Sequence, residues 1–172
     1  VLTVKKELPD IFGRPLGADY SNEYTVAPPE PLLQVDDDEK FTVLADQQPR
    51  LDVMARNIFS LDATVTKLTP ENFFWWTQQR ANFPLDREGN TANVRHELAS
   101  HGLEHREFSL KTNEKKNESP RQSILTLPGT KKDEQMANGV YVYTFSSPRI
   151  VDWKSTNPTL FTRVFNVTNL SV

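Results

Sequence analysis

Three histidines lie within ten residues, and they are the side chains most able to do chemistry. A zinc peptidase helix needs two histidines four residues apart, so that both rings leave one helical face and bind one metal ion. Here His101 follows His96 by five residues, roughly 140° around a helix, and Ser100 stands where that motif has histidine. His101 and His105 have helical spacing, but the sequence positions no third ligand with them. The pattern favours a solvated polar segment over a zinc site, and a Ser-His-Asp triad is equally unsupported.

Other kinds of catalytic or cofactor site are also missing their residues. The chain has no cysteine, which excludes disulfides, cysteine-ligated metals and a cysteine nucleophile. Its six glycines form no phosphate-binding loop. The acidic run Asp36-Asp37-Asp38-Glu39 lacks the alternating ligands and the glycine of a calcium loop, and is better interpreted as a solvated turn beside a strand. We therefore expect no enzyme and no catalytic, metal or cofactor-binding residue.

Four adjacent aromatic residues, Phe73-Phe74-Trp75-Trp76, form the most distinctive apolar segment. They could stack on a sugar or another ligand. Such a block is more typical of a helix that packs on a sheet, with Phe73 and Trp76 on one side. Since four adjacent side chains cannot all face inward, we expect one or two of them to be exposed or to contact a neighbouring domain. Trp153 is a further candidate for packing or partner contact.

Charge and hydropathy exclude two classes of partner. The 172 residues carry 20 Lys and Arg against 23 Asp and Glu, which gives a formal charge of −3. Binding of nucleic acid through phosphate contacts needs a clustered positive excess, and this balance offers none. The sequence has no run of about 18 apolar residues, which is the length needed to cross a membrane.

Both ends of the chain have the composition of strand interiors, which indicates a piece of a longer protein.

Alternation with a period of two residues dominates the chain and predicts an all-β fold. Apolar residues alternate with polar ones in many short runs bounded by Pro, Gly, Asn or Asp, which is typical of a sandwich. We expect a seven-stranded antiparallel β-sandwich with one short helix. Thr69 is the expected N-cap of that helix and Pro70 its first residue. Residues 86–119 are polar and are expected to form a long excursion between two strands, with weak helical or loop character up to His105. The expected strands include Leu2–Val4, Tyr24–Val26, Phe41–Val43, Leu51–Ala55, Ala63–Val65, Ile124–Leu127, Val140–Phe145 and Phe161–Val167.

Proline-rich connectors suggest the domain boundaries. A semi-rigid linker is expected at Pro28-Pro29-Glu30-Pro31. Residues 1–28 hold only two expected strands, too few to fold alone, and are assigned to the end of a preceding domain. Residues 29–150 are assigned to the sandwich. Residues 151–172 are assigned to a linker and the first strand of a following domain.

Several segments resemble the alpha-2-macroglobulin family of bacteria. The pattern Asp10-x-x-Gly13-x-x-Leu16 before a closing strand resembles the end of a bacterial Ig-like domain. The other similar segments open a macroglobulin domain, lie late in it, or begin the next domain: Gln48–Val53, Val65–Phe73, Gly139–Tyr143 and Arg163–Leu170. The resemblance does not extend to the segment from about residue 77 to residue 120.

This resemblance implies a macroglobulin-like domain of a large periplasmic protein, often a lipoprotein of the inner membrane. The family traps proteases: a target cleaves a bait region, and the molecule rearranges around it. The family's thioester would need a cysteine, which this chain lacks. The expected partners are neighbouring domains and, through the whole protein, target proteases; a membrane is expected only through a lipid anchor. The alternative is an Ig-like adhesion or ligand-binding module in which Trp75, Trp76 or Trp153 meets the partner.

Overall fold

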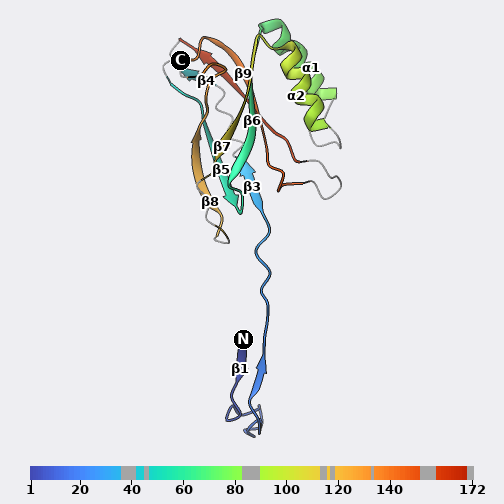
Figure 1. Cartoon of the computed structure of the whole chain (residues 1–172), viewed down its shortest axis with the longest axis vertical. Helices are drawn as coiled ribbons and strands as arrows, with labels where there is room; N and C mark the ends of the chain where they lie inside the picture. Colours follow the sequence, from blue (N-terminus) through green and yellow to red (C-terminus); the bar gives the residue numbers. More distant parts are fainter. Residues whose placement is uncertain are drawn as a thin grey trace.

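A computed structural model of the chain describes residues 1–35, 42–44, 47–82, 90–112, 116, 119–132, 134–151 and 158–169. A two-stranded hairpin at one end is joined by an extended linker to a β-sandwich that carries two helices (Figure 1). The elements are β1 (Leu2–Val4), β2 (Tyr20–Asn22), β3 (Leu32–Val35), β4 (Thr42–Leu44), β5 (Arg50–Arg56), β6 (Ser60–Leu68), α1 (Pro70–Asn82), α2 (Asn90–His101), β7 (Glu104–Lys111), β8 (Arg121–Thr126), β9 (Gly139–Ser146) and β10 (Phe161–Thr168).

The sandwich consists of a five-stranded and a three-stranded sheet. The larger sheet has the strand order β4-β10-β9-β6-β7, and the smaller one has the order β3-β5-β8. All of these pairs are antiparallel except β4 with β10. The fold-class prediction of an antiparallel β-sandwich is confirmed. Its strand count was too low, because the described sheets of the sandwich hold eight strands rather than seven.

The core lies between the two sheets and follows from the alternation in the sequence. In β9 the side chains of Tyr141, Tyr143 and Phe145 point into this core, where they meet inward residues of β5 and β6. The Tyr143 hydroxyl donates to the carbonyl of Pro128 at 2.9 Å. Burial raises the pKa of Tyr143, so the phenol stays neutral and keeps this hydrogen bond.

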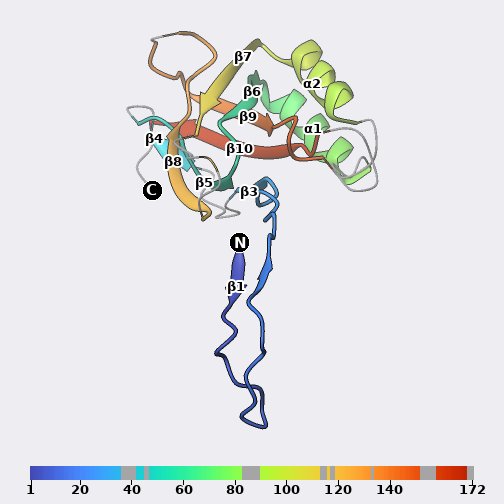
Figure 2. The same cartoon turned by 60° about the horizontal axis from the view of Figure 1, so that its bottom comes forward.

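Both helices cover the outer face of the five-stranded sheet (Figure 2). A second, smaller core beneath them contains Trp76 of α1, Val94 and Leu98 of α2, and Val142 of β9. The predicted helix start is confirmed, because the Asn72 N–H donates to Thr69 Oγ1 at 3.1 Å and the Phe73 N–H donates to the Thr69 carbonyl at 2.8 Å. The outer face of the three-stranded sheet carries no helix among the described residues.

Three expectations about individual segments were wrong. The long excursion forms a helix, α2, within the part expected to be helical or loop-like, but it also contains an unexpected edge strand, β7, which pairs with β6 from Glu104 to Lys111. The second strand of the hairpin is Tyr20–Asn22 rather than Tyr24–Val26. Residues 161–168 do not begin a following domain, because β10 lies inside the five-stranded sheet and pairs with β9 along Phe161–Val167. A strand with partners on both sides belongs to the sheet that contains it.

The acidic run at residues 36–39 and Trp153 lie outside the described residues. No described helix has the length and hydropathy needed to cross a bilayer.

Candidate functional site

The aromatic block lies on α1, and most of it packs against the molecule itself. Trp76 is 5% exposed, and Phe73 and Trp75 pack against the same small core. Phe74 alone points away, with 64% of its surface exposed. This arrangement confirms the expectation of a helix packed on a sheet with Phe73 and Trp76 on one side. It leaves little aromatic surface for a stacking ligand.

The three histidines are separated by the fold. The His101 ring stacks on Trp75, with centroids 4.1 Å apart and an interplanar angle of 19°. His105 lies on β7, where its Nδ1 is 2.7 Å from Thr66 Oγ1. His96 is exposed on α2. The described residues contain no group of three acidic or histidine side chains that could hold a metal ion.

Arg95 joins α2 to the sheet and was not singled out from the sequence. Its Nε donates to Thr144 Oγ1 at 3.1 Å. Its Nη2 donates to Ser146 Oγ at 3.0 Å and to the carbonyl of Asp62 at 2.9 Å. Burial lowers the pKa of the Arg95 guanidinium, and the carboxylates of Asp62 and Glu107 oppose that shift. The side chain remains a cation and acts as a positioning residue for α2.

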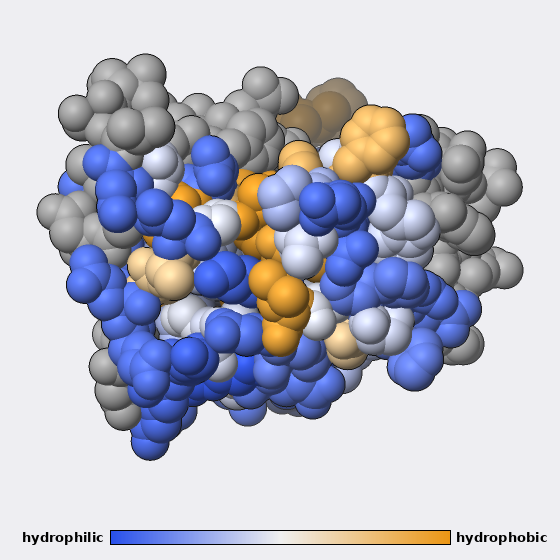
Figure 3. Space-filling view, turned by 90° about the horizontal axis from the view of Figure 1, so that it is seen from above, coloured by the Kyte–Doolittle hydropathy of each residue, from blue (hydrophilic) through white to orange (hydrophobic). Residues whose placement is uncertain are grey.

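The end of the sandwich farthest from the hairpin is mainly hydrophilic (Figure 3). Apolar side chains gather there mainly in a band across the middle of the described surface, with a few others scattered around it (Figure 3). At the same end Glu104 accepts a hydrogen bond from Thr130 at 2.5 Å and lies 3.6 Å from the Lys131 ammonium. These contacts lower the pKa of Glu104 and hold the loop before β9 against the start of β7. The described residues at this end therefore form no broad apolar platform (Figure 3).

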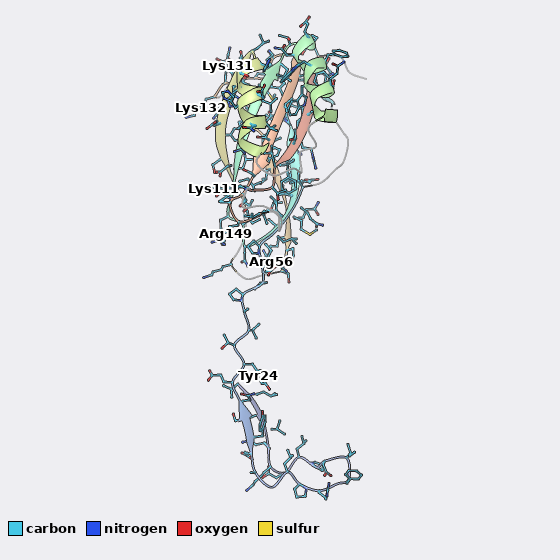
Figure 4. The ribbon with its side chains drawn as sticks, turned by 90° about the vertical axis from the view of Figure 1, so that its right-hand side faces the viewer. Tyr24, Arg56, Lys111, Lys131, Lys132 and Arg149 are labelled. Carbon is cyan, nitrogen blue, oxygen red and sulfur yellow. The ribbon has the colours of Figure 1, made fainter. Side chains whose placement is uncertain are left out.

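At the opposite end the linker is held by the side chains of Arg56, the last residue of β5, and Asn57, which follows it in the turn before β6. Arg56 Nε donates to the carbonyl of Glu30 at 2.9 Å, and Asn57 Nδ2 donates to the carbonyl of Pro29 at 2.7 Å. Asn57 has a φ of 58°, a left-handed conformation that asparagine tolerates better than most residues. Arg149 Nη1 donates to the Asn57 carbonyl at 2.9 Å. Arg56 and Arg149 both lie at this end of the sandwich (Figure 4).

The hairpin beyond the linker has no core of its own. Within residues 1–31, all of which the structure describes, no side chain is buried, and Ile11 is 93% exposed. Its loop is ordered by Asp10, whose Oδ1 accepts from the N–H groups of Phe12 at 2.8 Å and Arg14 at 2.9 Å. The large apolar side chains exposed on the hairpin and linker are Val1, Leu2, Leu8, Ile11, Phe12, Leu16, Tyr20, Tyr24 and Val26. A two-stranded ribbon of this kind is marginal in water and normally packs against another surface.

Solved structures of one protein have a fold similar to that of this chain. The crystal structure of native alpha-2-macroglobulin from E. coli, spanning its domains MG0-NIE-MG1, matches 96% of this chain with a TM-score of 0.54 and 17% identity. The fold is macroglobulin-like. A cryo-EM reconstruction of E. coli alpha-2-macroglobulin in its native conformation matches the same share with a TM-score of 0.55 and 18% identity.

The macroglobulin-like chain spans only part of these structures, 48% of the first and 10% of the second. No protein-family profile and no curated protein sequence matches it. At this identity the likeness shows the fold alone.

Proposed function

We propose that this chain is a structural macroglobulin-like domain of a larger protease-trapping protein, in which it sets the positions of neighbouring domains. The observation that carries this proposal is the pair of linker carbonyls held by Arg56 and Asn57. A flexible linker allows neighbouring domains to reorient. This linker contains consecutive prolines and has two carbonyls hydrogen-bonded to the sandwich, so it restricts the direction in which the hairpin extends from the sandwich. The likeness to E. coli alpha-2-macroglobulin supports the same proposal at the level of fold.

The hairpin supports an assignment of residues 1–28 to the end of a preceding domain. Its apolar side chains would be covered by the remaining strands of that domain, which would remove the exposed surface noted above. The partners in this proposal are neighbouring domains of the same polypeptide and, through the whole protein, target proteases. The proposed location is the periplasm, with attachment to the inner membrane through a lipid anchor of the whole protein.

The adhesion-module alternative depended on exposed tryptophans. Trp76 is buried and Trp75 is stacked on His101, so no described tryptophan favours it.

Protease trapping is tested on the whole protein that contains this chain. It is incubated with endopeptidases of different specificity, and their remaining activity is assayed on a large protein substrate and on a small peptide. Enclosure of a protease blocks large substrates and leaves small ones accessible, because the active site itself is not occupied. Loss of large-substrate cleavage with retained peptide cleavage supports the proposal. Unchanged activity on both substrates for every protease tested contradicts it.

A further inference from the structure

Strand β8 forms one edge of the three-stranded sheet and has β5 as its only strand partner among the described residues. An edge strand presents unpaired backbone groups, and proteins usually protect such edges with charged side chains, prolines or bulges. Strand β8 begins with Arg121, but the five residues that follow it, Gln-Ser-Ile-Leu-Thr from Gln122 to Thr126, include no charged side chain, no proline and no bulge. Ile124 is 62% exposed on the outer face of the sheet.

The neighbouring edge strand of the other sheet is protected in the usual way. Strand β7 carries His105, Arg106, Glu107 and Lys111 along its eight residues. On β3, the opposite edge of the smaller sheet, Arg163 Nη2 donates to the Val35 carbonyl at 3.1 Å and so occupies part of the backbone. The edge of β8 is thus less protected by charged side chains than the edges of β7 and β3.

The direction of the free backbone groups on β8 follows from one hydrogen bond. The Leu127 N–H donates to the carbonyl of Pro49 at 2.9 Å, so the backbone of Leu127 faces β5. Backbone direction alternates along a strand, and therefore Leu125 and Ser123 also face β5. The N–H and C=O groups of Gln122, Ile124 and Thr126 point to the open edge.

These three residues are self-complementary about Ile124. In an antiparallel pair of two identical β8 strands, Ile124 lies opposite Ile124 of the second copy, and Gln122 lies opposite Thr126. Every outward N–H and C=O of the three residues then has a partner, and no like charges face each other. The two Ile124 side chains meet on the same face of the joined sheet, where they bury apolar surface.

We propose that β8 is an interaction surface for a second copy of this chain, paired antiparallel through Gln122–Thr126 with Ile124 at the twofold axis. The association is expected to be weak, because one short strand pair buries far less than the roughly 1,200 Å² of a stable interface. It makes the two three-stranded sheets continuous across the pair.

Sedimentation equilibrium over a concentration series of the 172-residue chain tests this proposal. The parent chain is expected to self-associate reversibly, and Ile124→Lys is expected to weaken the association about tenfold or more, because it sets two ammonium groups opposite each other and removes the apolar pair. Gln34→Lys is the matched control, because Gln34 is also exposed on the same sheet face but lies on β3. It should leave the association unchanged.

Mixing two variants identifies the twofold contact directly. Ile124→Lys and Ile124→Glu should each be monomeric alone and should associate with each other when mixed, since the two substituted side chains then form an opposite-charge pair. A parent chain that stays monomeric at all concentrations overturns the proposal. Self-association that survives Ile124→Lys also overturns it, and a further variant, Ile11→Ser with Phe12→Ser, then shows whether the hairpin is the surface instead.

Discussion

Asn57 donates a hydrogen bond from Nδ2 to the carbonyl of Pro29 at 2.7 Å, across 28 positions of sequence. This contact links the turn between β5 and β6 to the linker that leads to the hairpin. Arg149 binds the carbonyl of the same asparagine from the segment after β9. The linker is therefore tied to a turn that is itself held by the larger sheet.

Replacing Arg95 with alanine should destabilise the sandwich by about 1–3 kcal/mol, because hydrogen bonds from a charged donor are lost at the boundary between α2 and the sheet. The free energy of unfolding from urea denaturation measures this loss. His96→Ala, the adjacent exposed position on α2, should stay within about 0.5 kcal/mol of the parent chain. Equal effects of the two substitutions would show that Arg95 does not fix α2.

Gly102 should not tolerate a side chain. A Cβ at this position would lie 2.3 Å from Thr66 Cγ2 and 3.0 Å from the Leu98 carbonyl oxygen. We expect Gly102→Ala to lower the free energy of unfolding by about 1–3 kcal/mol through overpacking. Thr66→Ser removes the methyl group with which the new Cβ would clash. The double variant Gly102→Ala with Thr66→Ser should therefore recover part of the lost free energy of unfolding. If Gly102→Ala alone proves neutral, α2 and β6 are not packed as closely as described.

Thr162 is a position where loss of a polar atom should stabilise the protein. Its side chain is 4% exposed and its hydroxyl has no hydrogen-bond partner in the described structure. Thr162→Val keeps the shape and removes the unsatisfied group, so we expect a gain of about 1 kcal/mol in thermal or urea unfolding. Thr64→Val is the control of opposite sign, because the Thr64 hydroxyl shares a 2.7 Å hydrogen bond with Thr144. A loss at Thr162 comparable to that at Thr64 would contradict this description.

Acid should loosen the hairpin loop. Hydrogen bonds from the backbone N–H groups of Arg14 and Phe12, and from the Arg14 side chain, lower the pKa of Asp10 below its usual value of 3.8. Because the folded pKa is the lower one, this stabilisation is present above the unfolded pKa and disappears as the pH falls through the folded pKa. Amide chemical shifts of Phe12 and Arg14 followed by NMR below pH 4 should report the change. Asp10→Ala should abolish that titration; shifts that persist in this variant would exclude Asp10 as their source.

The regular parts of the fold could be predicted because alternation determines which face of a strand is buried. Tyr141, Tyr143 and Phe145 share one face of β9 in the sequence and also in the core. The helix start at Thr69 was equally predictable, since an N-cap followed by proline is a local signal.

Predictions that needed long-range information were less successful. Strand β10 was assigned to another domain because nothing local shows that residues 161–168 pair with β9 and, in parallel, with β4. Strand β7 was not predicted because of its polar composition. An edge strand that carries His105, Arg106 and Glu107 resembles a polar loop in composition. Arg95 gave no signal, because its acceptors come from β6 and β9, more than 30 residues away in the chain.

The most direct test of the proposed scaffolding function measures how firmly the linker is held. The chain has no cysteine, so spin labels can be attached specifically through Ser21→Cys on the hairpin and Gln34→Cys on the sandwich. Electron–electron double resonance then gives the distribution of distances between the two labels. We predict a narrow distribution in the parent chain and a clearly broader one when Arg56→Ala and Asn57→Gly are combined. A parent distribution as broad as that of the double variant would contradict a domain that positions its neighbours.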